Sequence, residues 1–259
     1  YMAQLIRGIE EIGRVYKYDI LLQSSYGDEN ALNNSIDFLA TKQVEGFIII
    51  TQNLSDEALL KLRETRIPFI LLDKFHAYKN LTTVKVDYKK EQYNLTKYLF
   101  SQGNDNVLFI GDKADNVLNN AKIAGYRKAI EELGKEEFIV KIDGITSNDG
   151  YNIGKDAIDV CKENGITAVS LLNDEVAIGF IDYCADNGIK VPDDLSVAGF
   201  GDSSIASIYR PNLTTVSIPY YDIGAISIRA LIKRIKKEDE ILGKDWIMDC
   251  NIVARESSR

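Results

Sequence analysis

The sequence predicts an α/β protein built from two doubly wound parallel sheets. Short runs of Ile, Val and Leu alternate with stretches in which apolar residues recur every three to four positions. Runs that are apolar at every position are typical of parallel strands covered by helices on both faces. The alternation fills two successive blocks with no Pro/Gly/Ser-rich linker between them, which indicates two subdomains.

Length and composition are those of a globular protein. The 259 residues suffice for one large domain or two smaller ones. Apolar residues make up 45% and charged residues 27% of the chain, an ordinary globular mixture. The longest apolar run, residues 46–50, is far shorter than the roughly 18 residues that a membrane span requires. We therefore expect no membrane partner.

In the first half, apolar runs predict four strands, at residues 18–23, 46–50, 69–72 and 83–86. Helical spacing predicts a helix over residues 5–16 at the start of the chain. Three later helices are expected to begin after side chains that can cap them, namely Asp28, Ser55 and Asp87.

The second half repeats this pattern and then breaks it. Strands are predicted at residues 107–110, 138–142, 168–172, 195–198, 214–217 and 246–253. Helices are predicted over residues 123–133, 149–161, 174–185 and 221–237. The last helix has more apolar residues than one core-facing stripe needs. It is therefore expected to pack on the sheet and on a partner chain, and the alternative is a helix enclosed in one subunit.

Charge and cysteine content limit the partners and the compartment. The formal charge is −8, and the longest basic run, residues 233–237, lies in a helical pattern typical of a solvated face. This stretch of chain is therefore expected to bind DNA poorly. Three cysteines without a C-x-x-C motif favour a reducing cytoplasm, with Cys161 and Cys184 as buried thiols.

The sequence shows no motif typical of catalysis, metal binding or cofactor binding. The one histidine, His76, lies in a Lys/Tyr-rich loop, and there is no G-x-S-x-G elbow. Gly199 and Gly201 supply only two glycines of a dinucleotide fingerprint, and no P-loop occurs. We predict no catalytic residue, no metal and no cofactor, and hence no enzyme.

Several phrases resemble the core of LacI-family transcription regulators. They are residues 1–10 (YMAQLIRGIE), 44–48 (VEGFI), 191–200 (VPDDLSVAGF), 211–216 (PNLTTV) and 254–258 (ARESS). The resemblance spans the whole chain, and the last three phrases are fairly specific in combination. Residues 220–225 (YYDIGA) are similar to the catabolite control proteins within this family.

The resemblance implies a periplasmic-binding-protein type I fold with three chain crossings between subdomains. The N-terminal subdomain would comprise residues 1–86 plus 218–241, and the C-terminal subdomain residues 87–217 plus 242–259. Family members place a first strand, and before it a DNA-binding headpiece, ahead of the residues that match Tyr1 and Met2. The phrases therefore imply a core whose first strand is missing.

The resemblance also implies a cytoplasmic, dimeric, ligand-responsive transcription regulator that senses a sugar or sugar derivative. The operator DNA would bind through the absent headpiece, and effector binding would change the angle between the subdomains. An extracytoplasmic sugar-binding protein of a transport system shares the fold and is the alternative. The VPDDLSV and RESS phrases favour the regulator. A hydrolase on this scaffold is a third class, and no nucleophile–base pair supports it.

Candidate effector-binding residues come from matching the family's ligand contacts position by position. They are Tyr1, Met2, Gln52, Lys74, Lys122, Ile145, Thr146, Asn173, Gly201 and Asp202. Each could instead be an ordinary loop or helix residue. Most follow predicted strands, and ligands of open α/β sheets bind outside the carboxyl ends of strands.

Two departures from the family pattern suggest an anionic effector such as a sugar phosphate or sugar acid. Lys122 stands where Arg is usual, and Gly201 stands where many members carry an acidic residue. If Lys74 also points inward, two ammonium groups would share the site and need compensation. Asp202 or Asp143 could supply that compensation without any anion, and a phosphorylated carrier protein could replace the small ligand altogether. The sequence leaves these alternatives open.

Overall fold

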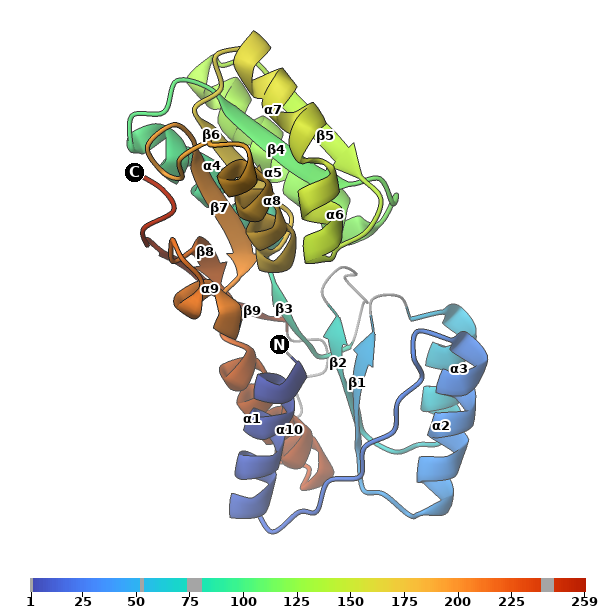
Figure 1. Cartoon of the computed structure of the whole chain (residues 1–259). Coiled ribbons are helices and arrows are strands. Elements are labelled where there is room, and N and C mark those ends of the chain that lie inside the picture. Colours follow the sequence, from blue (N-terminus) through green and yellow to red (C-terminus); the bar gives the residue numbers. More distant parts are fainter. Residues whose placement is uncertain (1, 52–53, 74–80, 239–244) are drawn as a thin grey trace. The chain divides into compact units, whose positions relative to one another are not determined.

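The computed structural model describes residues 2–51, 54–73, 81–238 and 245–259 (Figure 1). They form two compact units: unit 1, Tyr1–Val86 and Pro219–Met248, and unit 2, Asp87–Ile218 and Asp249–Arg259. The chain thus passes between the units three times. The structure moves the last predicted boundary from 241/242 to 248/249, because β9 (Asp245–Met248) pairs with a strand of unit 1.

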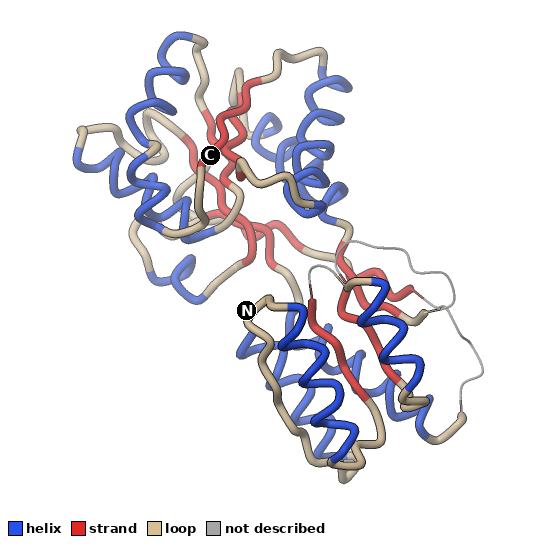
Figure 2. Tube along the Cα trace, turned by 90° about the vertical axis from the view of Figure 1, so that its right-hand side faces the viewer, coloured by secondary structure: helices blue, strands red, loops and turns tan. Residues whose placement is uncertain are grey.

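Unit 1 contains a four-stranded parallel sheet with the order β1-β2-β3-β9. The first three strands are β1 (Phe47–Thr51), β2 (Phe69–Asp73) and β3 (Thr83–Val86). Four helices flank them: α1 (Met2–Val15), α2 (Glu29–Thr41), α3 (Asp56–Glu64) and α10 (Tyr220–Ile235). In Figure 2 helices flank the strands on both sides, as the apolar runs of the sequence predict.

The helices α1 and α10 pack against each other at unusually short range. A Cβ atom added to Gly8 would lie 2.1 Å from the Tyr221 carbonyl oxygen, and one added to Gly224 would lie 2.2 Å from that of Leu5. Glycine at both positions permits this contact. Five apolar residues of α10 are consequently buried within unit 1, namely Ile223, Ala225, Ile228, Leu231 and Ile232, whereas Ile226, Ala230 and Ile235 are half-buried. Much of the apolar surface of α10 is thus covered within the subunit, and packing of the rest on a partner chain stays a prediction.

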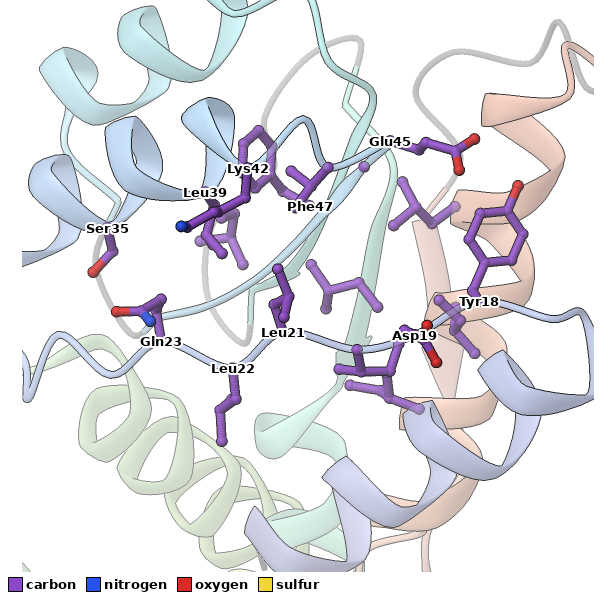
Figure 3. Close-up of a pocket in the computed structure, with 18 of the residues that line it drawn as sticks. Tyr18, Asp19, Leu21, Leu22, Gln23, Ser35, Leu39, Lys42, Glu45 and Phe47 are labelled. Atoms are coloured by element: carbon purple, nitrogen blue, oxygen red, sulfur yellow. The ribbon is translucent and has the colours of Figure 1, made fainter.

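The strand predicted at residues 18–23 does not form. This segment runs beside a cavity of about 520 Å³ that separates it from β1, and it makes no strand pairing (Figure 3). Leu21 and Leu22 point to opposite sides of the segment in Figure 3, as successive residues of a strand do. The sequence pattern is therefore that of a strand, but a strand also needs a hydrogen-bonding neighbour.

Unit 2 contains a six-stranded sheet with the order β10-β8-β7-β6-β4-β5. The strands are β4 (Val107–Asp112), β5 (Phe138–Ile142), β6 (Ala168–Leu171), β7 (Ser196–Gly201), β8 (Thr214–Ser217) and β10 (Asn251–Val253). All neighbours are parallel except β10, which runs antiparallel to β8. The single strand predicted at 246–253 is thus two strands, β9 and β10, in different units.

Helices cover both faces of this sheet. They are α4 (Tyr88–Ser101), α5 (Val117–Leu133), α6 (Ser147–Asn152), α7 (Gly154–Glu163), α8 (Asp174–Asp186) and the short α9 (Ser204–Ile208). Residues of α7 and α8 form one core with Leu108, Val169 and Val197. The helices α4 and α5 pack together and contact β4, where the rings of Phe109 and Tyr126 stack.

Local predictions about helix starts and cysteines are confirmed. Asp28, Ser55 and Asp87 each accept a hydrogen bond from the backbone of the helix that they cap. Cys161 and Cys184 are buried free thiols, and burial raises the pKa of each to about 12. Within the described residues, no helix combines the length and apolar character needed to cross a membrane.

Candidate functional site: the carboxyl edge of the unit 2 sheet

Parallel strands of unit 2 end at a common edge of the sheet, here called the carboxyl edge. It is formed by the residues that follow β4, β5, β6, β7 and β8. Four predicted effector residues follow these strands, namely Ile145, Thr146, Asn173 and Asp202; Gly201 ends β7, and Lys122 reaches the edge from α5. Such an edge is where open α/β sheets bind ligands.

Of the remaining predicted residues, the structure describes Met2 alone. Met2 begins α1 of unit 1, and 37% of its surface is exposed. Tyr1, Gln52 and Lys74 lie outside the described residues, as does His76. Their contribution to a binding site therefore stays a prediction.

Lys122 is a buried cation whose charge is stabilised by polar and aromatic neighbours. Only 5% of the residue is exposed. Its ammonium group donates to the Leu172 carbonyl oxygen at 2.6 Å and lies 3.8 Å from the centroid of the Phe200 ring and 5.7 Å from that of Tyr88. Aromatic faces attract cations, so these contacts offset part of the cost of burying the charge. Lys122 thereby ties α5 to the end of β6.

Asn173 joins the ends of β5 and β6. Its side-chain oxygen caps α8 by accepting from the Val176 backbone N–H at 2.8 Å. Its side-chain nitrogen donates to the Ile145 carbonyl oxygen at 2.9 Å. The amide is therefore both a helix cap and a cross-link between two loops of the carboxyl edge.

The loop after β5 ends in a capping box. Thr146 and Asp149 exchange hydrogen bonds with each other's backbone N–H at the start of α6. Hydrogen bonds from the Thr146 hydroxyl and backbone hold the pKa of the Asp149 carboxyl below its usual value. The neighbouring Ile145 is 55% exposed, so the loop presents an apolar side chain beside these polar groups.

Asp174 is a buried carboxylate that sequence reasoning missed. The residue is 2% exposed, and its two oxygens accept from the Thr215 hydroxyl and from the Ser203 backbone N–H, both at 2.6 Å. A Cβ atom on Gly199 would lie 2.5 Å from its Oδ1 atom, so this glycine makes room for the carboxylate. An acid directly after Asn173 looks like an ordinary first-turn acid, which is why it passed unnoticed.

The segment Gly201–Ser203, here called the β7 corner, carries two predicted residues. Asp202 pairs with Arg255 at 2.7 Å, and its backbone N–H donates to the Thr215 hydroxyl at 3.3 Å. Gly201 has φ +129°, a conformation that side-chain-bearing residues rarely adopt. The backbone conformation therefore explains why a glycine stands at position 201. Reduced repulsion toward an anionic ligand is not needed as the explanation.

Exposed charge at the carboxyl edge lies beside β4 and β5. Lys113 and Asp143 pair at 2.8 Å, with 55% and 79% of their side chains exposed. Asp112, also missed from the sequence, accepts from the Ala114 backbone N–H at 2.9 Å. Asp143 and Asp202, the two acids expected to compensate Lys122, therefore each have a different cationic partner.

The chemistry of the carboxyl edge suits binding of a polar small molecule. Amide, hydroxyl and carboxylate groups lie there beside the apolar side chain of Ile145. In the parts of the chain that the structure describes, no group of three His, Cys, Asp or Glu side chains could hold a metal ion. Hydrogen-bonding groups beside an apolar side chain are typical of a small-ligand binding site.

Comparisons with known proteins agree with this geometry. Residues 96–258 match the Periplasmic binding protein-like domain. Catabolite control protein A from Priestia megaterium is 31% identical over 92% of this chain and 72% of its own length. The transcriptional regulator RegA from Clostridium saccharobutylicum is 32% identical over the whole chain and 78% of its own length.

Solved structures show the same fold. A structure of the transcription regulator CcpA of Lactococcus lactis has a TM-score of 0.84 and 28% identity, covering 100% of this chain and 94% of that one. A LacI family regulator from Enterococcus faecium with bound ribose has a TM-score of 0.86 at 24% identity, over 99% and 93% of the two chains. The protein is thus of the periplasmic-binding-protein-like class.

Proteins of this class are either sugar-binding proteins of transport systems or transcription regulators. The similar proteins indicate which of the two this chain is. The chain belongs to the LacI family of transcriptional regulators, together with catabolite control protein A and RegA. The regulator is favoured over the transport protein because these relatives are regulators over nearly all of the chain.

Proposed function

We propose that this chain is the effector-binding part of a transcription regulator and that it senses a sugar or sugar derivative at the carboxyl edge of unit 2. The observation that carries the proposal is the gathering of Lys122, Ile145, Asn173 and Asp202 at that one edge through direct contacts of their own loops. Structural neighbours with bound ribose, xylulofuranose and cellobiose support a sugar as the ligand class.

A thermal-shift panel tests this proposal. It pairs ribose, xylulose and cellobiose with ribose 5-phosphate and gluconate, because a ligand that binds only the folded state stabilises it by mass action. A ligand at one hundred times its Kd should add about 2.7 kcal/mol to the free energy of unfolding. If no sugar or sugar derivative shifts the transition at millimolar concentration, the effector proposal fails.

The panel also separates neutral from anionic effectors. Lys113 is the half-exposed cation of the edge, whereas Lys122 is covered by rings and a carbonyl oxygen. We propose that a phosphate or carboxylate group of the ligand would pair with Lys113 and displace Asp143. If ribose raises the unfolding temperature and ribose 5-phosphate does not, the effector must be a neutral sugar.

The remaining parts of the proposal follow the family. Regulators of this kind act on operator DNA, and we propose that DNA binds through a headpiece rather than through these two units. We further propose that the protein works in the cytoplasm and is not an enzyme. A full-length protein that failed to shift a promoter fragment in an electrophoretic assay would contradict the regulator's DNA-binding role.

A phosphorylated carrier protein is the second candidate input, favoured by the relatives named catabolite control protein A. The outer faces of α1 and α10 carry exposed basic side chains, at Arg7, Arg14, Arg229 and Lys233. Clustered Arg and Lys residues are suited to phosphoprotein recognition. Charge reversal at Arg229 should abolish pull-down of a phosphorylated carrier and spare sugar binding, whereas unchanged pull-down would exclude this surface.

We propose that the protein is a homodimer and that unit 2 supplies part of the interface. Ile208 on α9 is 71% exposed, and the next residue, the half-buried Tyr209, hydrogen-bonds to Asp182 of α8. An exposed large apolar side chain on a fixed element is suited to an interface. Ile208→Asp should halve the mass measured by light scattering, whereas Leu60→Asp, on exposed α3 of unit 1, should not. A monomeric wild-type protein at micromolar concentration would refute the dimer.

A further inference from the structure

The β7 corner has a backbone conformation that needs external support. Gly201 has φ +129° and Asp202 has φ +53°. A Cβ atom on Gly201 would meet only the Asp174 Oδ2 atom, at 3.7 Å, so backbone geometry and not lack of space calls for glycine. Residues with positive φ persist where surrounding contacts determine them.

Contacts from inside unit 2 hold the corner on one side. The backbone N–H groups of Asp202 and Ser203 donate to the Thr215 hydroxyl and to Asp174. The Thr215 hydroxyl also donates to Asp174, so both bonds lead back to one buried carboxylate. These contacts fix the backbone of the corner but leave the Asp202 side chain to another partner.

That partner is Arg255, from the last residues of the chain. Its Nη2 atom donates to Asp202 Oδ1 at 2.7 Å, and only 18% and 21% of the two side chains are exposed. A charge-assisted hydrogen bond with this degree of burial is stronger and less screened than a surface ion pair.

Arg255 is itself firmly anchored. Its backbone N–H donates to the Thr214 hydroxyl at 2.9 Å, and its Nη1 atom donates to the Leu213 carbonyl oxygen at 2.8 Å. Two residues later the buried Ser257 donates to the Val197 carbonyl oxygen at 2.6 Å. The tail is thus fixed to β7 and β8, and Arg255 has little freedom to follow a moving loop.

We propose that Arg255 is a positioning residue that determines which ligands the β7 corner accepts. The inference rests on the proposed effector role of the carboxyl edge. By holding the Asp202 side chain, Arg255 adds a second tether to the backbone contacts of the corner and neutralises the Asp202 carboxylate, while Asp174 is buried and hydrogen-bonded. A ligand therefore meets no free carboxylate at this corner, which suits phosphate or carboxylate groups and disfavours chelation of sugar hydroxyls.

The test replaces the guanidinium by an uncharged chain of similar length, Arg255→Met. The control is Arg259→Met, which removes an exposed pair with Asp193 at 3.0 Å from the same tail. Two quantities are measured: hydrogen exchange of residues 199–206, and the ratio of affinities for ribose 5-phosphate and ribose. Loss of a buried charge-assisted bond should speed exchange at the corner by about tenfold or more and lower the affinity ratio by a similar factor. The control should change neither.

A double variant, Asp202→Asn with Arg255→Met, separates charge from folding. It lacks the freed carboxylate, so the affinity ratio should return close to the wild-type value while exchange stays fast. Unchanged exchange in Arg255→Met would overturn the proposal, as would a ratio that stays low in the double variant. If neither sugar binds the wild-type protein, the effector proposal fails, and the exchange result still decides whether Arg255 positions the corner.

Discussion

The two units are built on the same principle, but they differ in how completely their sheets are filled. In unit 2, Ile110 of β4 has neighbours on both strand edges and is fully buried. In unit 1, β1 borders a cavity of about 520 Å³, and the segment 18–23 across that cavity has a strand-like sequence without strand pairing. The polar network of the candidate site lies in the fully packed unit.

Among the described residues, this network lies at the strand ends of unit 2. The bonds of Lys122, Asn173 and Asp174 depend on the ends of adjacent strands being held at fixed spacing. A continuous sheet provides that spacing; the sheet β1-β2-β3-β9 of unit 1 is also continuous, but a cavity borders its β1 edge. We therefore expect unit 1 to be the less stable of the two.

The largest expected effect comes from matched truncations on equivalent strands. Ile110→Ala, in the middle of β4, should cost about 2–5 kcal/mol. Ile48→Ala, which lines the cavity beside β1, should cost about 1 kcal/mol or less, because atoms next to a void have fewer contacts to lose. Urea unfolding measures both, with the single Trp246 on β9 reporting on unit 1. Equal costs would show that the cavity is filled in solution.

A second comparison concerns the caps of one helix in each unit. Asp28→Ala and Asn173→Ala should each lower the free energy of unfolding by about 1 kcal/mol, because each side chain caps a helix. Asn173→Asp keeps the acceptor for the cap and adds a favourable charge at the helix N-terminus, but it replaces the donation to Ile145 by repulsion between two oxygens, so on balance it should cost less. It is therefore the better variant for testing effector binding. A cost for Asn173→Asp as large as that for Asn173→Ala would contradict this division of roles.

Filling the cavity should raise the free energy of unfolding, by less than the truncations above lower it. Ser35 lines the cavity from α2, and its hydroxyl donates only to the Ala31 carbonyl oxygen of its own helix among the bonds described (Figure 3). Ser35→Leu should stabilise unit 1 by about 0.5–1 kcal/mol. Ser101→Leu is the matched control, since that serine makes the same kind of bond on an exposed part of α4. Destabilisation by Ser35→Leu alone would argue against free apolar space.

The smallest effect is a pH dependence located in unit 2. Glu91 on α4 is 3% exposed, and burial raises the pKa of its carboxyl. The stability linked to Glu91 is thus present below its unfolded pKa of 4.5 and is lost as pH rises through its higher folded value. Glu91→Gln should remove that loss, so the stability difference between variant and wild type should grow with pH above 4.5. A pH-independent difference would contradict burial of the charge.

Sequence reasoning succeeded where local chemistry was sufficient. The caps Asp28, Ser55 and Asp87 and the buried thiols Cys161 and Cys184 follow from residue type and spacing alone. The regulator family was also predicted correctly, from phrases spread along the whole chain. The sequence also places several candidate residues at strand ends, and their role in ligand binding stays a prediction.

The failures all involved contacts between distant parts of the chain. Residues 18–23 have a strand pattern, yet pairing depends on a neighbour that no local pattern reveals. Much of the apolar surface of α10 is covered by close contact with α1, which begins more than 200 residues earlier. Likewise Asp202 pairs with Arg255, and Asp174 accepts a hydrogen bond from Thr215. The sequence could not show that these carboxylates already have partners.

Residue-resolved hydrogen exchange of the unliganded protein tests the central contrast most directly. Exchange reports the free energy of opening for each backbone amide. We predict the slowest exchange in β4, β6 and β7 of unit 2, and exchange that is faster by about a hundredfold or more in β1 of unit 1, beside the cavity. Protection of β1 equal to that of β6 would contradict the account, because it would mean that the sheet of unit 1 is as completely packed as that of unit 2.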